Sequence, residues 1–207
     1  MNVRAVIVPG GGANFGSLRV ACARIGVETE VSDDAARIRA ASHVLLPGVG
    51  AAAHAMREMR ERGLDRVLPT LSQPLLGICL GMQLLFDSSE ESLDANAPAG
   101  GTPTACLGIV PGVVRRLPAA PSWPHMGWNT LRDRADHPLL AGIGGGDWFY
   151  FVHGFAAPAA ADTIAASEHG GTFAAAVARG NVYGAQFHPE KSAAAGRRLL
   201  ANFFALT

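Results

Sequence analysis

The sequence predicts an α/β fold: a single-domain sandwich with a mostly parallel central sheet flanked by helices, and a β-rich C-terminal half. In the first half of the chain, short apolar runs alternate with segments of helical periodicity, which favours parallel strands covered on both faces. Beyond residue 105, β-rich segments follow one another. A length of 207 residues is enough for one substantial core, so we expect one domain over residues 1–207.

The elements of the first half are predicted from their apolar residues. Runs of aliphatic and β-branched residues predict strands at 3–8, 27–31, 43–46 and 75–78. Spaced apolar residues predict helices at 16–25 and 51–62. The run at 75–78 contains no polar residue, which is typical of a parallel strand buried on both faces.

The second half is predicted to be mostly strand. The expected strands are 108–117, 127–131, 148–152, 163–168, 172–179 and 182–187, followed by a closing helix at 193–206. Residues 88–104 are rich in Ser, Asp, Ala, Pro and Gly, which predicts an exposed loop before these strands.

A cysteine lies at the junction between the strand at 75–78 and a following helix, which we expect to be amphipathic and to continue through residue 86. Gly77 and Gly81 flank Cys79 at two residues on either side, the spacing of a nucleophile elbow. The helix N-terminus favours a thiolate at Cys79, and the backbone N–H of Leu80 can donate to an oxyanion. The alternative is a buried structural cysteine.

A histidine and a carboxylate follow the strand predicted at 182–187. Because alternate residues of a strand point the same way, we expect His188 and Glu190 to lie on one side, with Pro189 stiffening the link. Glu190 can then orient the imidazole while its other nitrogen faces the thiol of Cys79. Alone, this tripeptide is more typical of a surface turn; with the elbow, it predicts a Cys-His-Glu hydrolytic site.

Five segments together resemble a known family, the class I (triad) glutamine amidotransferases. They are residues 77–83, 186–192, 47–50, 124–129 and 149–153. The last three, with the Lys-Ser after the His-Pro-Glu, are most similar to the glutaminase subunits of imidazole glycerol phosphate synthase. The resemblance runs from the first predicted strand to the last helix. It implies that Cys79 attacks the side-chain amide of glutamine, with His188 as base and Glu190 as its orienting carboxylate.

The resemblance also assigns the oxyanion hole. Pro47-Gly48-Val49-Gly50 follows the third strand at the sheet edge where open α/β folds bind ligands. In the family, an N–H near Val49 or Gly50 joins that of Leu80 in holding the oxyanion. Taken alone, the segment is equally an ordinary strand-to-helix turn.

Further residues are expected to bind glutamine by the same resemblance. These are Gln83, one turn past the elbow, the segment His153-Gly154-Phe155, and Gly50. Family members often carry Ser or Thr where this chain has Gly154. By position alone, Gln83 is as often a helix-surface residue.

The resemblance implies a partner, the cyclase subunit that uses the ammonia to build imidazole glycerol phosphate. It places Asn14, Met126, Trp128 and Lys191 at the interface with that subunit. Taken alone, Met126 and Trp128, like Trp123 and Tyr150, are more typical of a core. Pro9-Gly10 stands where the family usually has Asp-Tyr.

Composition excludes other classes of function. Lys and Arg number 17 and Asp and Glu number 17, which leaves no basic surface for nucleic acid. No run is long enough to cross a membrane, and the N-terminus is typical of a strand rather than a signal peptide. Three widely spaced cysteines favour the cytoplasm, with Cys22 and Cys106 structural. We expect no metal and no cofactor.

Three alternatives remain open from the sequence. A related glutaminase could serve pyridoxal phosphate or nucleotide synthesis, and a cysteine hydrolase or peptidase could share the elbow. A non-enzymatic module could bind a nucleotide through the glycine-rich loop at 10–16, with Glu28 or Glu30 on the ribose. This last alternative leaves the Cys-His-Glu pattern unexplained.

Overall fold

A central sheet of seven strands organises the protein. The structure, a computed structural model, describes residues 4–10, 15–91, 102–118 and 122–207. The sheet order is β11-β12-β13-β4-β3-β1-β2, with parallel pairing from β2 through to β13 and antiparallel pairing of β11, β12 and β13. Its strands are β1 (Arg4–Ile7), β2 (Glu28–Val31), β3 (His43–Gly48), β4 (Leu75–Cys79), β11 (Thr163–Glu168), β12 (Thr172–Arg179) and β13 (Val182–Ala185).

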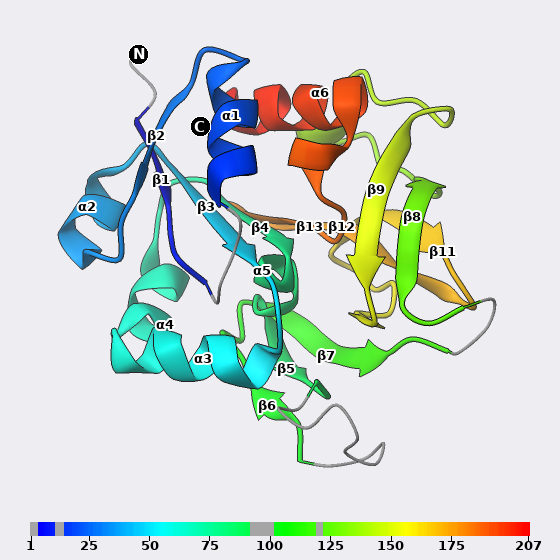
Figure 1. Cartoon of the computed structure of the whole chain (residues 1–207), viewed down its shortest axis with the longest axis horizontal. Helices are drawn as coiled ribbons and strands as arrows, with labels where there is room; N and C mark the ends of the chain where they lie inside the picture. The colour runs from blue at the N-terminus through cyan, green and yellow to red at the C-terminus, as the bar shows by residue number, and fades with distance from the viewer. Residues whose placement is uncertain (1–3, 11–14, 92–101, 119–121) are drawn as a thin grey trace.

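Helices cover both faces of this sheet (Figure 1). The helices α1 (Phe15–Ala23) and α6 (Ala193–Phe204) bury apolar residues such as Leu18 and Leu199 against one face. On the other face, α3 (Ala52–Glu61) and α4 (Leu64–Val67) bury residues such as Met56. Because both faces are covered, β3 and β4 are buried along their whole length, as their apolar runs predict.

Two smaller sheets extend the second half of the chain. A four-stranded sheet has the order β10-β7-β5-β6, built from β5 (Phe86–Ser89), β6 (Thr104–Ala105), β7 (Val110–Arg116) and β10 (Phe155–Ala156). An antiparallel pair, β8 (His125–Thr130) and β9 (Trp148–His153), stands beside β11 and β12 (Figure 1). The predicted α/β class, mostly parallel central sheet and β-rich second half are confirmed.

The structure corrects several predicted elements. The helix after the elbow, α5 (Leu80–Gln83), ends early, and it is buried all round rather than amphipathic. It ends because Phe86 pairs with Val110 and opens β5, a strand that the sequence did not predict. The short helix α2 (Ala35–Ala40), α4 and the 3₁₀ turns η1 (Leu68–Thr70), η2 (Pro138–Leu140) and η3 (Pro189–Lys191) were not predicted either. No helix among the described residues is both long and apolar enough to span a membrane.

The closest backbone approach lies where α5 meets β3. A Cβ on Gly81 would stand 1.7 Å from the carbonyl oxygen of Leu46, and one on Gly77 would stand 2.6 Å from the carbonyl oxygen of Gly81. Both glycines therefore let β4 turn into α5 against the neighbouring strand. These close approaches are the physical reason for the two glycines that flank Cys79.

We expect Gly81→Ala to destabilise the protein by about 3 kcal/mol or more, because two backbones must move apart to admit one methyl group. The urea midpoint of unfolding measures this loss. The matched control is Gly146→Ala, since a Cβ there meets no atom within 4 Å. Equal unfolding midpoints for the two variants would contradict the prediction.

Candidate active site

Cys79 lies at the strained turn between β4 and α5. Its backbone φ of 54° and ψ of −114° fall where L-residues rarely occur, and its side chain is buried. Such strain persists only where the surroundings enforce it, and it is typical of functional sites. The elbow predicted from the glycine spacing is confirmed.

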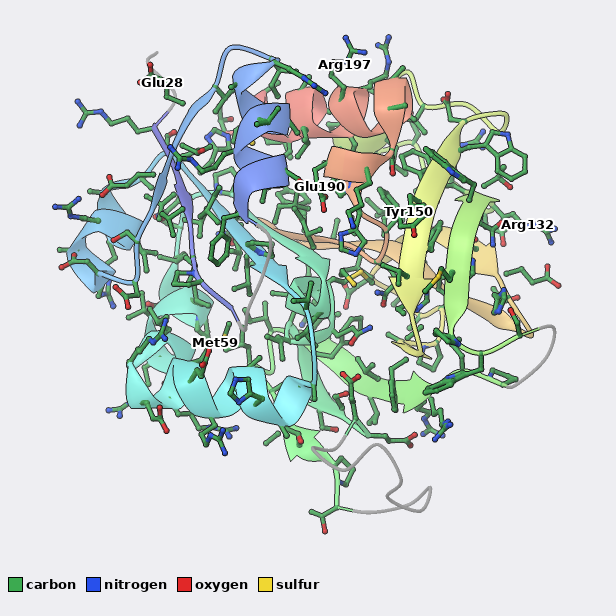
Figure 2. All side chains as sticks on the ribbon, viewed as in Figure 1. Glu28, Met59, Arg132, Tyr150, Glu190 and Arg197 are labelled. Carbon is green, nitrogen blue, oxygen red and sulfur yellow. The ribbon has the colours of Figure 1, made fainter. Side chains whose placement is uncertain are left out.

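His188 and Glu190 face each other beyond the end of β13. The Nδ1 atom of His188 lies 2.8 Å from Oε1 of Glu190, and both side chains are buried. The predicted route to this contact is wrong, because β13 ends at Ala185 and the 3₁₀ turn η3 brings Glu190 back to the imidazole. Glu190 lies in the interior of the molecule, and Tyr150 lies on β9 nearby (Figure 2).

The environment of His188 favours the protonated imidazole. Burial lowers the pKa of His188, but its interactions with Cys79 and Glu190 outweigh burial and raise the pKa to about 10. The Nε2 atom is buried and has no hydrogen-bond partner of its own within the described residues. An imidazolium at this position stabilises negative charge on the sulfur of Cys79.

A cavity of about 320 Å³ opens in front of Cys79 and His188. Every residue predicted for the oxyanion hole and for substrate binding lines this cavity: Val49, Gly50, Leu80, Gln83, His153, Gly154 and Phe155. Gln83 is buried, so the helix-surface alternative is wrong. A larger groove, of about 770 Å³, follows the edge strand β2 but is not lined by Cys79, His188 or Glu190.

Glu91 also lines the cavity, and the sequence analysis missed it. Its Oε2 accepts a hydrogen bond of 3.3 Å from the N–H of Ala52, at the start of α3. Burial raises the pKa of Glu91 to about 7, although that hydrogen bond opposes the shift. The only signal in the sequence was an acidic residue after the β5 segment, inside a stretch predicted as loop.

Two further segments pack next to the cavity wall, one at Gly10 and the other at Trp123. Gly10 pairs with Gly48, and a Cβ on Gly10 would stand 2.9 Å from the carbonyl oxygen of Pro47. Trp123 covers Gly154 so closely that a Cβ there would stand 2.6 Å from its ring. A side chain at position 154 would clash with this ring, so the contact requires glycine there.

The residues expected at a partner interface lie mostly on the surface of the β8–β9 pair. Met126 and Trp128 are 64% and 50% exposed, which overturns the core alternative, and Trp123 is 40% exposed. Lys191 is exposed, with its ammonium 5.7 Å from the centre of the Tyr150 ring. Asn14 lies outside the described residues.

Behind the cavity, a chain of hydrogen bonds connects buried histidines. Asn129 Nδ2 lies 3.3 Å from His125 Nε2, and His125 Nδ1 lies 3.0 Å from His153 Nε2. His153 Nδ1 lies 2.9 Å from the carbonyl oxygen of Phe155. Since that oxygen only accepts, Nδ1 of His153 must donate to it. Nε2 of His153 then accepts from Nδ1 of His125, whose Nε2 accepts from Asn129. Each imidazole therefore carries one proton, on Nδ1, and both are neutral. His125 is thus fixed behind His153.

The chain matches a described protein family and named relatives. The family model described as glutamine amidotransferase class-I matches residues 2–206. Imidazole glycerol phosphate synthase subunit HisH of Xanthomonas axonopodis pv. citri (strain 306) is 49% identical over 203 residues, covering 97% of this chain and 96% of the relative. The protein of that name from Colwellia psychrerythraea is 44% identical over 211 residues, covering 99% and 94%.

Solved structures share the fold at low identity. One glutamine amidotransferase superposes with a TM-score of 0.70 at 19% identity, covering 97% of both chains. A glutamine amidotransferase from Thermotoga maritima has a TM-score of 0.62 at 16% identity, covering 98% of this chain and 83% of its own. These likenesses establish the architecture.

We expect acid to destabilise the fold through the buried histidine pair. Burial lowers the pKa of His125 to about 4 and that of His153 to about 3, from 6.5. The unfolded chain therefore takes up protons that the folded chain does not, so stability is full above about pH 6.5 and falls as the pH drops toward 4. Urea denaturation at pH 7 and pH 4.5 should show a loss of about 2 kcal/mol or more.

Substitution at His125 separates this effect from general acid sensitivity. His125→Asn keeps a donor toward His153 without titrating, so its loss between the two pH values should be smaller. His54→Asn changes an exposed histidine and should retain the wild-type loss. Equal losses in all three proteins would rule out the buried pair as the source.

Proposed function

Because the chain belongs to the class I glutamine amidotransferases, we propose that Cys79, His188 and Glu190 form the catalytic triad of a glutaminase. The observation that carries the proposal is the strained Cys79 at the mouth of a cavity that also holds His188, with Glu190 bonded to the far side of the imidazole. A peptidase or a nucleotide-binding module is a poorer fit to this site. Glu28, one of the two carboxylates that the nucleotide-binding alternative offers to the ribose, lies at the rim of the molecule (Figure 2).

In this mechanism the first step is attack on glutamine. The thiolate of Cys79, stabilised by protonated His188, adds to the side-chain amide carbon, and the C–S bond forms as the carbonyl π pair moves to oxygen. The N–H groups of Leu80 and of the Val49–Gly50 loop line the same cavity and are proposed to hold the oxyanion. Collapse of the intermediate breaks the C–N bond, and His188 gives its proton to the departing ammonia.

The second step is hydrolysis of the glutamyl thioester. Neutral His188 takes a proton from water, hydroxide adds to the thioester carbon, and the sulfur leaves as the thiolate. Glu190 keeps Nδ1 protonated throughout, so that Nε2 is the atom that exchanges the proton. Water and glutamine are consumed, and glutamate and ammonia are released.

Substrate orientation is assigned to the cavity wall. The ammonium of glutamine needs an anionic partner, and Glu91 supplies one, since Glu190 is bonded to His188. The backbone of His153, Gly154 and Phe155 is proposed to contact the rest of the amino-acid group, together with Gly50. Gln83 lines the same cavity as Cys79 and is proposed to contact the bound glutamine as well.

The protein works as the glutaminase subunit of an imidazole glycerol phosphate synthase, in histidine biosynthesis. Ammonia in water is mostly protonated and lost, so the partner proposed is the cyclase subunit, which receives it directly. The exposed apolar residues Met126 and Trp128, with Lys191, are the proposed contact surface, to which Asn14 is added from the resemblance. We propose one amidotransferase domain over residues 1–207, a cytoplasmic location, and no cofactor.

We expect the isolated protein to release glutamate from glutamine slowly, and the cyclase with its nucleotide ligand to increase the rate roughly 5- to 150-fold, as couplings between sites usually do. A coupled glutamate assay measures both rates. Cys79→Ala should have no activity in either condition, because no thiol remains to attack the amide.

Two other outcomes would change the proposal. If the rate of glutamate release were the same with and without the cyclase, the protein would still be a glutaminase, but the proposed partner would be rejected. Turnover by a folded Cys79→Ala protein would remove Cys79 as the nucleophile.

We expect Glu91→Gln to raise the KM for glutamine by about 10- to 100-fold, with a smaller effect on kcat, because a charged partner of the ammonium is lost. For the wild type, the KM should rise as the pH falls below about 7, since the raised pKa of Glu91 means that it loses its charge there. Initial rates at varied glutamine between pH 6 and 8 give both quantities.

The adjacent residue provides the control. Glu90→Gln removes an exposed carboxylate that accepts from the N–H of Arg116 and lies outside the cavity lining, so its KM should match the wild type. A KM for Glu91→Gln that equals that of Glu90→Gln would remove Glu91 from the substrate site.

A further inference from the structure

One fully buried polar side chain beside the nucleophile has no part in the triad. Gln186 lies between β13 and His188, and none of its surface is exposed. Its Nε2 atom lies 3.9 Å from the sulfur of Cys79, and its Oε1 lies 3.0 Å from Nε2 of Gln83. A buried amide is expected to be held by partners at both ends, and the sulfur is one of them here.

The partners of Gln83 fix which end of Gln186 faces the sulfur. Gln83 Nε2 lies 2.7 Å from the carbonyl oxygen of Phe155, which can only accept, so the amino end of Gln83 points there. The same nitrogen then donates its second hydrogen to Oε1 of Gln186. The N–H of Gln186 is left to point at Cys79.

The carbonyl of Phe155 is itself fixed by the buried histidines. It also accepts from Nδ1 of His153, and Nε2 of His153 in turn accepts from Nδ1 of His125. A continuous series of hydrogen bonds thus runs from Asn129 on β8 to the sulfur, and every amide and imidazole in it has one allowed orientation. The direction of the Gln186 dipole is set by residues outside the triad.

The other neighbours of the Cys79 sulfur show why the orientation of the Gln186 amide affects the thiolate. The carbonyl oxygen of Val152 lies 3.7 Å from it, which suits a thiol hydrogen but repels a thiolate. The ionisable groups around Cys79 are His188 with Glu190 behind it, His153, and Glu91 on the cavity wall. Among the neutral side chains described at the sulfur, Gln186 presents a positive dipole end, in addition to the backbone N–H groups at the start of α5.

We propose that Gln186 is a further residue of the glutaminase site, whose N–H, oriented by Gln83, stabilises the thiolate of Cys79. The inference rests on Cys79 being the nucleophile. A merely structural Gln186 would matter for folding and leave the ionisation of Cys79 unchanged. Reversal of the amide end that faces the sulfur distinguishes the two roles.

The test is the pH dependence of Cys79 alkylation by iodoacetamide, read from the mass of the Cys79 peptide. Gln186→Glu keeps the oxygen that accepts from Gln83 and replaces only the N–H end, and Gln186→Met removes the donor without adding charge. Both should raise the alkylation midpoint, by about one pH unit for the carboxylate variant, and reduce kcat about 10-fold or more with little change in KM. Burial raises the pKa of Cys22 to about 12 and that of Cys106 to about 11, which keeps them out of the reaction below pH 9.

Gln73→Glu is the matched control, because its amide donates to the carbonyl of Ile38 and it lines no part of the cavity. Its midpoint should equal that of the wild type. Wild-type midpoints in both folded Gln186 variants would overturn the proposal. An unreactive Cys79 and absent glutamine hydrolysis in the wild type would instead remove the proposed function, on which this inference depends.

Discussion

The structure depends on one close backbone approach, the contact of the β4–α5 turn with β3. Gly81 lies against the carbonyl of Leu46, where no side chain fits, and this contact holds Cys79 at a positive φ. The same contact places the end of β3, and therefore Val49 and Gly50, beside Cys79. Strain at Cys79 is sustained because the turn continues a fully buried strand, β4, which pairs with β3 on one side and β13 on the other.

His188, on the other side of the site, is held by hydrogen bonds to the backbone of β9. The N–H of His188 donates to the carbonyl of Tyr150 at 2.9 Å, and Ser192 Oγ donates to the carbonyl of His188 while accepting from the N–H of Tyr150. The strand that holds His188 also supplies Val152 and His153 to the cavity wall. His188 and this part of the wall are therefore anchored to the same strand, β9, and the exposed ring of Trp128 on β8 lies against Tyr150 of β9.

The sequence alone predicted those features of the fold and site that depend on residues close together in the chain. The glycines around Cys79 predicted the elbow, and the apolar runs predicted the buried strands, because each depends on neighbours along the chain. It was insufficient where contacts join distant segments. Glu91 reaches the cavity only because β5 pairs with β7, and His125 meets His153 only through the register of β8 and β9. The turn that brings Glu190 to His188 was likewise mistaken for strand alternation.

The two histidines of the cavity are held in opposite charge states by their neighbours. His188 faces Cys79 and Glu190, and these raise its pKa to about 10 despite burial. Burial lowers the pKa of His153 to about 3, and the neighbouring imidazole of His125 adds to this fall, although the hydrogen bond to the carbonyl of Phe155 opposes it. Positive charge in the site is therefore concentrated on His188, next to the sulfur. A second imidazolium at His153 would compete for the thiolate and repel the ammonium of glutamine, so its neutrality is as much a part of the site as the charge on His188.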